Sequence, residues 1–185
     1  MEADRLRWNK RHAEDPYPER PSPLLVDFLS SANVGKALDI ACGMGRNSRF
    51  LAQNGFEVHS IDGSDFAIDS LKDSQKIQAE CVDLDGYAIT PSAYDVIVNI
   101  HFLERRLIPG IIEGLKSGGM LFFETFVKSD DPKLTWGSNP HHFLLPNELL
   151  RLFGGLHIHH YQERIVPRCG EDLAMLASLV AQKGG

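Results

Sequence analysis

Three aspartates stand where short apolar segments end, and their spacing is typical of a nucleoside-binding site. Asp39 lies near the end of KALDI, Asp62 ends FEVHSID and Asp83 ends IQAECVD. A carboxylate after the second segment can accept hydrogen bonds from both hydroxyls of a ribose, and one after the third can accept from an amine such as that of adenine. Because ligands of open α/β sheets bind at the carboxyl ends of the strands, the three aspartates predict one common crevice.

The segment ALDIACGMGRN turns from an apolar run through Gly43 and Gly45 into a helical pattern. Glycine lets a ligand approach the backbone closely, and N–H groups at the start of the following helix can bind a carboxylate or phosphate. Two glycines in such a turn are by themselves equally typical of a structural turn. Asp62 lies seventeen positions after Gly45, a spacing expected for nucleoside recognition, so the combination predicts a nucleotide-like ligand.

Short apolar runs alternate with helical patterns from Lys36 onward, which predicts βαβ units in an α/β fold with a mainly parallel sheet. Strands are expected at residues 36–40, 56–62, 77–83, 93–100, 118–126, 156–166 and 172–182. Helices are expected at residues 4–12, 24–31, 46–55, 65–76, 104–116 and 146–153. The last two strands should pair as an antiparallel hairpin, although the leucines and alanines of 172–182 also suit a helix.

Several residues mark where these helices should begin, end or break. Asp4 and Ser64 are natural N-caps, and Gly55 stands where a C-cap is expected. Pro109 and Gly110 are expected to interrupt the helix predicted at 104–116.

Composition favours a single domain and excludes several classes of partner. The chain has 185 residues, 43% of them hydrophobic, which is enough for one core and short for two domains. Its formal net charge of −6 and its mostly scattered basic residues argue against general binding to nucleic acid or anionic membranes. We find no apolar run typical of a signal peptide or membrane span, so a cytoplasmic protein is expected. Cys42, Cys81 and Cys169 lack paired spacing, so neither a disulfide framework nor a metal site is expected.

A proline cluster at positions 16, 18, 21 and 23 separates a charged N-terminal segment from the remainder. We therefore expect a helical segment at 1–23 and the main domain at 24–185. Trp8 and Arg11 lie nearly one helical turn apart and can face the same surface. They either contact the bound ligand or, as readily, pack on the domain.

The motif DIACGMG resembles the first motif of the class I S-adenosylmethionine-dependent methyltransferases, an acidic residue followed by GxGxG. Ala41 replaces the first glycine, a departure that matters if the backbone there has positive φ. The resemblance continues through IDGSDFAI, VDLDG, YDVIVNI and LKSGGMLFFETF, where Ser117 replaces the proline that commonly precedes the paired glycines.

Within this class, residues Lys36 to Lys183 resemble the tellurite-resistance methyltransferases and their small-molecule and thiol-methylating relatives. The resemblance implies a Rossmann-like, seven-stranded, mainly parallel sheet with the last strand antiparallel and helices on both faces. It also implies that S-adenosylmethionine is the cofactor and that a helix before the main domain covers it. The cofactor contacts it implies are Asp39, Ala41, Gly43, Gly45, Arg46, Asn47, Asp62, Gly63, Ser64, Asp83, Leu84 and Asn99, together with Trp8 and Arg11 of the N-terminal segment.

The methyl acceptor is expected near His101, which follows the strand that ends close to Asn99. Methyl transfer from a sulfonium needs a general base only when the acceptor must lose a proton, as an alcohol or amine must and a thiolate or chalcogen oxyanion need not. His101 is the candidate base, or equally a cap of the following helix. Arg105 and Arg106 can hold an anionic acceptor or remain solvated.

Three functions fit these residues, and the first explains most of them. The first is methyl transfer to a small molecule by a monomer or homodimer that needs neither nucleic acid nor a membrane. The second is an NAD-dependent oxidoreductase, although Ser48 stands where a GxGxxG fingerprint needs a small apolar residue. The third is a noncatalytic module that binds S-adenosylmethionine.

Overall fold

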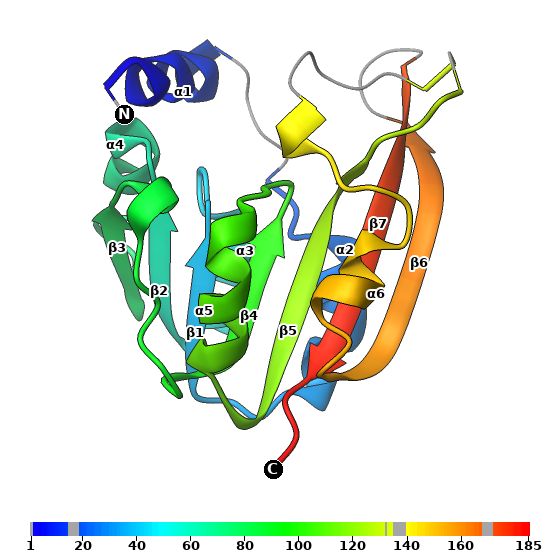
Figure 1. Cartoon of the computed structure of the whole chain (residues 1–185). Coiled ribbons are helices and arrows are strands. Elements are labelled where there is room, and N and C mark those ends of the chain that lie inside the picture. The colour runs from blue at the N-terminus through cyan, green and yellow to red at the C-terminus, as the bar shows by residue number, and fades with distance from the viewer. Residues whose placement is uncertain (1, 15–18, 132, 135–139, 168–171) are drawn as a thin grey trace.

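The computed structural model describes residues 2–14, 19–131, 133–134, 140–167 and 172–185, and these form an α/β fold around one sheet (Figure 1). The sheet has seven strands in the order β3-β2-β1-β4-β5-β7-β6. Its strands are β1 Lys36–Ile40, β2 Glu57–Asp62, β3 Ile77–Cys81, β4 Tyr94–Ile100, β5 Leu115–Val127, β6 His157–Pro167 and β7 Leu173–Gln182.

The strands from β3 to β5 are parallel neighbours, whereas β7 is antiparallel to both β5 and β6. The strand order reverses between β1 and β4, since β2 and β3 lie on one side of that point and β5 lies on the other. In doubly wound sheets this switch point opens the crevice that binds a ligand. The predicted Rossmann-like sheet with an antiparallel last strand is confirmed.

Helices cover both faces of the sheet. They are α1 Glu2–Glu14, α2 Pro23–Phe28, α3 Arg46–Gln53, α4 Asp65–Asp69, α5 Ile108–Gly114 and α6 Glu148–Leu152, with four short 3-10 turns: η1 Leu29–Ser31, η2 Leu84–Gly86, η3 Arg105–Leu107 and η4 Pro140–His142. Residues of α5 and α6 pack in one apolar cluster with Leu38 and Phe123, and residues of α2 and α3 pack in another with Phe122. Helix α1 lies across the carboxyl edge of the sheet beside α4 (Figure 1).

Alternation along β5 explains these two clusters. Leu121 and Phe123 point to the α5 and α6 side, while Met120 and Phe122 point to the α2 and α3 side, and all four are buried. A central strand with both faces covered must be apolar in nearly every position. Glu124, which follows in the same strand, is therefore an exception that needs partners.

Four of the expected boundaries are wrong. The helix predicted at 65–76 ends at Asp69, because Ser70 donates its hydroxyl to Ala67 O and the following N–H groups form tighter turns. The first helix begins at Glu2, so Asp4 lies within it and is no N-cap. Pro109 lies in the first turn of α5, where its missing N–H is tolerated, and starts that helix instead of breaking it.

The fourth concerns Asp83, which does not end a strand. Strand β3 ends at Cys81, and the Asp83 carboxylate accepts a hydrogen bond from Asp85 N at 3.1 Å, which caps η2. Ser64 does cap α4, since its hydroxyl accepts from Ala67 N, and β7 is a strand as expected.

Candidate functional site

Asp62 joins the glycine turn after β1 to the start of α4. Its Oδ2 accepts a hydrogen bond from Gly43 N and its Oδ1 accepts one from Ser64 N, both at 2.8 Å. The carboxylate is 7% exposed and lies at the carboxyl end of β2, the neighbour of β1. Two of the predicted cofactor motifs are therefore held by one side chain, and the remaining lone pairs of that carboxylate face the same edge.

The turn between β1 and α3 has an unusual backbone. Ala41, Gly43 and Gly45 have φ values of 53°, 53° and 77°, in the left-handed region. A Cβ on Gly45 would lie 2.3 Å from Leu71 Cδ2, so only glycine fits there. A positive φ at Ala41 means that the departure from the glycine motif carries backbone strain.

Asp39 lies fully buried beneath this turn. It accepts a hydrogen bond from Ser48 Oγ at 2.6 Å, and Ser48 accepts one from Ser60 Oγ at 2.8 Å. Burial, offset in part by the Ser48 hydrogen bond and reinforced by the nearby charge of Asp62, raises the pKa of Asp39 to about 7. The carboxyl therefore changes charge near neutrality, and a cation bound above the turn would favour its ionised form.

Arg46 and Asn47 hold the chain that leads in from the N-terminal segment. Asn47 Oδ1 accepts from Ser22 N at 2.9 Å, and Arg46 donates to Arg20 O at 3.3 Å. Asn47 is 5% exposed. Through these two contacts the pair pins residues 20–22, the chain that leads into α2.

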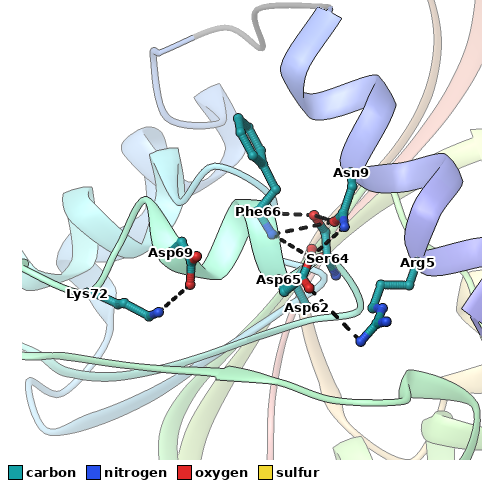
Figure 2. A network of polar contacts seen from close by, with 9 residues as sticks. Arg5, Asn9, Asp62, Ser64, Asp65, Phe66, Asp69 and Lys72 are labelled. Atoms are coloured by element: carbon teal, nitrogen blue, oxygen red, sulfur yellow. Dashed lines mark hydrogen bonds and ion pairs between the residues drawn. The ribbon is translucent and has the colours of Figure 1, made fainter.

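Helix α1 is tied to the same site through Asn9 (Figure 2). Its Oδ1 accepts from Ser64 Oγ at 2.6 Å, and its Nδ2 donates to Asp65 Oδ1 at 2.5 Å. Arg5 adds an ion pair to Asp65 at 4.0 Å, and Phe66 N donates to Asn9 at 3.4 Å. The Ser64 hydroxyl is thus used to cap α4 and to dock α1.

The face of α1 that turns toward the glycine turn carries His12. This side chain is 7% exposed, and its Cε1 lies 3.4 Å from the point where a Cβ on Gly43 would stand. Burial lowers the pKa of His12, against the opposing charge of Asp62. Trp8 is half-buried and lies 6.0 Å from the His12 ring, while exposed Arg11 stacks over Trp8 at 5.3 Å.

His12 is a site residue that the sequence analysis missed. His12 lies four residues after Trp8. Residues four positions apart in a helix share one face, so the sequence already places His12 on the same face of α1 as Trp8. Its burial beside Gly43 shows that this face of α1 lies over the turn.

The residues expected at the adenine end lie at the edge of this region. Asp83 is exposed and Leu84 is half-buried, and both follow β3, next to Gly63 across the β2 end. Val82 N donates to Asp62 O at 2.9 Å, which fixes the distance between the two loops. A Cβ on Gly63 would lie 3.8 Å from Val82 O, an ordinary van der Waals distance.

Asn99 and His101 lie at the end of β4, beside the end of β1. Asn99 pairs with Ile40, is 1% exposed and donates its amide to Phe102 O at 2.7 Å, so it pins the turn that carries His101. His101 has a φ of 62°, and its ring stacks on Phe126 at 5.1 Å. The carboxyl edge thus brings Asp39, Asp62, Asn99 and His101 onto consecutive neighbouring strands.

The two arginines after His101 are engaged in structural contacts. Arg105 forms a fork with the Glu148 carboxylate at 2.7 and 2.9 Å and also donates to the carbonyls of His141 and Phe143. Arg106 pairs with Glu104 at 2.9 Å. Arg105 therefore anchors the chain before α6, which does not support the alternative that it binds an anionic acceptor.

The described part of the chain shows neither a metal-binding cluster nor a membrane-spanning helix. Over the described ranges, we find no group of three or more His, Cys, Asp or Glu side chains placed to hold a metal ion. In the same part of the chain, no helix has both the length and the apolar character needed to cross a bilayer.

The fold described above is shared with known proteins. The structure superposes on that of TehB from Haemophilus influenzae with a TM-score of 0.78 at 23% identity, covering 95% of this chain and 67% of that one. It also matches the N-methyltransferase NodS from Bradyrhizobium japonicum WM9, solved with S-adenosyl-L-homocysteine, with a TM-score of 0.75 at 21% identity over 98% of each chain.

Sequence comparison gives relatives of the same kind. A ubiquinone biosynthesis O-methyltransferase from Idiomarina loihiensis is 26% identical over 79% of this chain and 72% of its own. A probable S-adenosyl-L-methionine-dependent methyltransferase TehB from Haemophilus influenzae is 31% identical over 58% of this chain, and the match spans 41% of that protein. The chain therefore spans less than half of the length of this TehB relative.

The family described as tellurite resistance protein TehB matches residues 24–165, most of the chain. This match confirms the predicted resemblance, and the relatives make S-adenosylmethionine the cofactor in place of a nicotinamide. The chain belongs to the TehB family of S-adenosylmethionine-dependent methyltransferases.

Proposed function

We propose that the chain transfers the methyl group of S-adenosylmethionine to a small-molecule acceptor, such as a thiol or a chalcogen oxyanion. The observation that supports this most directly is the Asp62 carboxylate, which holds Gly43 and Ser64 together at the carboxyl edge of the sheet. The acidic balance of the chain supports a small acceptor over a nucleic acid.

The residues at the carboxyl edge fit the cofactor in three respects. Gly43 places no side chain between the turn and His12, whose Cε1 lies 3.4 Å from the point where a Cβ would stand. Asp62 can accept from the ribose hydroxyls, and Asp39 supplies a carboxyl that a cation favours in its ionised form. We assign the remaining contacts to the residues Ala41, Gly45, Arg46, Asn47, Gly63, Ser64, Asp83, Leu84, Asn99, Trp8 and Arg11, with Ser64, Asn99, Arg46 and Asn47 acting through the turns and segments they hold.

The cofactor, when bound, supplies an activated methyl group on a sulfonium. The chain's part is positioning and exclusion of water. In this proposal residues 24–185 hold the cofactor, the 1–23 segment covers it through α1, and His101 lies on the acceptor side. A covered site lowers the local dielectric and keeps water from the reacting atoms.

Calorimetric titration with S-adenosylmethionine and S-adenosylhomocysteine tests the cofactor site. We expect both to bind, and Asp62→Asn to raise the Kd roughly 10- to 100-fold, because a hydrogen bond to a charged group contributes about 1.5–3 kcal/mol. Asp69→Ala removes an exposed carboxylate from the nearby helix α4 and serves as the control. NAD(H) and NADP(H) should not bind.

Acceptor screening then tests the transfer itself. Conversion of S-adenosylmethionine to S-adenosylhomocysteine that depends on an added thiol or chalcogen oxyanion is the expected result. Tight cofactor binding without turnover on any small acceptor would contradict the proposal and favour a noncatalytic cofactor-binding module.

A further inference from the structure

Asp39 is held differently from the buried glutamates of the chain. Buried Glu124 of β5 pairs with Arg164 at 3.0 Å, and buried Glu148 pairs with Arg105 at 2.7 Å. Asp39 is 1% exposed, and it forms no ion pair with any side chain that the structure describes. A buried carboxylate without a paired cation is costly to ionise, so Asp39 readily holds a proton.

Hydroxyl groups and a second carboxylate surround Asp39 in place of a cation. Its Oδ2 accepts from Ser48 Oγ at 2.6 Å, and Ser48 accepts from Ser60 Oγ at 2.8 Å. Asp62 ends the neighbouring strand β2, while uncharged Val98 of β4 lies opposite Asp39 on the other side of β1. Burial and the like charge of Asp62 outweigh the Ser48 hydrogen bond, and the pKa of Asp39 rises to about 7.

Three further titratable groups lie around the two aspartates. Arg46 of α3 acts on Asp39 with a positive charge that favours the ionised form. His12 of α1 faces Asp62, and burial lowers the pKa of its ring. Cys42 follows β1, and burial raises the pKa of its thiol, so the thiol is uncharged near neutrality. A change of charge on Asp39 is therefore felt directly by a ligand that binds beside Asp62.

The cofactor and its product differ by one charge. S-adenosylmethionine carries a positive sulfonium, whereas S-adenosylhomocysteine has a neutral thioether sulfur. A positive charge favours the ionised form of a neighbouring carboxyl, and it does so more strongly in a buried site than in water. The two ligands should therefore change the protonation of Asp39 to different extents.

We propose that Asp39 is a specificity-determining residue, which distinguishes the sulfonium from the thioether by exchanging a proton with solvent. The inference rests on the proposed methyl transfer and concerns how the site tells cofactor from product. With the cofactor bound, Asp39 releases its proton to solvent and adds a negative charge beside Asp62. Methyl transfer leaves the bond electrons on sulfur and removes its positive charge, and Asp39 then takes a proton back from solvent. The site thus becomes less negative when the product must leave.

The direction of the pH dependence follows from this exchange. A site that loses a proton on binding holds its ligand more tightly as the pH rises toward the pKa of the free site. The Kd of S-adenosylmethionine should therefore fall about tenfold between about pH 5.5 and 7, through the contribution of Asp39. The Kd of S-adenosylhomocysteine should fall about threefold or less over the same range.

Calorimetric titration in buffers of different ionisation enthalpy counts the protons released by each ligand. At pH 7 we expect about half a proton with S-adenosylmethionine, because Asp39 is then about half protonated in the free protein. S-adenosylhomocysteine should release clearly fewer. Asp39→Asn keeps an oxygen that can accept from Ser48 but cannot ionise, so the difference between the two ligands should disappear. The titration of His12 and of the ligand amine is common to both proteins and cancels in this comparison.

Asp69→Asn is the matched control, because it removes an exposed carboxylate of α4 that pairs with Lys72. It should release the same number of protons as the parent protein with each ligand. Infrared difference spectra of the parent protein give a second measurement that does not depend on how the variant folds. Binding of S-adenosylmethionine should remove the carbonyl band of a protonated carboxyl, and S-adenosylhomocysteine should remove less of it.

The possible outcomes separate the inference from the proposed function. Equal proton release with the two ligands, an unchanged difference in Asp39→Asn, or no loss of the carboxyl band would overturn the inference and leave the methyl transfer in place. Failure of both ligands to bind would overturn the proposed function, and the inference with it.

Discussion

Ala41 has a φ of 53° in the turn between β1 and α3. It stands where the GxGxG motif of the class I methyltransferases has its first glycine. The left-handed conformation costs a residue with a Cβ about 1–2 kcal/mol, whereas glycine adopts it freely but loses more entropy on folding. We expect Ala41→Gly to raise the free energy of unfolding by about 0.5–1 kcal/mol, measured by chemical denaturation.

Ala37→Gly provides the comparison for this substitution. Ala37 is fully buried in β1, where glycine brings only loss of packing and greater entropy in the unfolded chain. It should be destabilising. A destabilised Ala41→Gly variant would show that the Ala41 methyl group makes contacts worth more than the strain.

Single residues were predictable where their position follows from a strand end. Asp39 and Asp62 lie at the carboxyl edge because their strands are short, apolar and parallel. His12 was not predictable in this way, since its burial at the site depends on a contact with Gly43, which is distant in sequence. The apolar run around Glu124 carried a signal, because a charged residue inside a buried strand needs partners.

At the scale of elements, the docking of α1 depends on a small polar contact. Asn9 is the link to Ser64 and Asp65, and the neighbouring Lys10 is exposed. We expect Asn9→Ala to speed amide hydrogen exchange in α1 and to weaken S-adenosylhomocysteine binding by roughly 5- to 30-fold, as expected for the loss of about 1–2 kcal/mol.

Lys10→Ala is the control for this helix, since it removes a side chain of α1 that does not contact α4. Exchange and affinity should both match the parent protein. If Asn9→Ala speeds exchange and leaves affinity unchanged, α1 does not act as the cover of the cofactor.

The strands were more predictable than the helices. Short apolar runs predicted all seven strands, and the pattern is clearest for β1, β4 and β5, which are buried on both faces of the sheet. Helix α4 was predicted too long, since the periodicity up to Leu71 does not show that Ser70 competes for a backbone carbonyl. Pro109 was expected to interrupt a helix because the helix was predicted to begin at residue 104. Residues Arg105–Leu107 form η3 instead, so α5 begins at Ile108 and Pro109 lies in its first turn.

At the scale of the whole molecule, Asp39 links folding to pH. Its pKa is raised from 3.8 to about 7 on folding, so the folded chain binds more protons than the unfolded chain between these values. Its contribution to stability is therefore complete below about pH 4 and is lost as the pH rises through 7. Relative to Asp39→Asn, the parent should lose up to about 1.4 kcal/mol per pH unit across this window.

Denaturation of both proteins at several pH values measures this difference, in which the shared titrating groups cancel. A flat difference between pH 4 and 7 would contradict the assignment of a raised pKa to Asp39. Saturating cofactor should reduce the slope, because the cation favours the ionised carboxyl.

Strand β7 follows both of its neighbours, β5 and β6, in the sequence and lies between them in the sheet. During synthesis on the ribosome, β5 and β6 emerge before the segment that joins them. Until residues 173–182 leave the exit tunnel, the apolar β5 presents an unpaired edge, the kind of surface that attracts other strands. The nascent chain should therefore be most vulnerable to aggregation, and most dependent on chaperones, just before β7 is released.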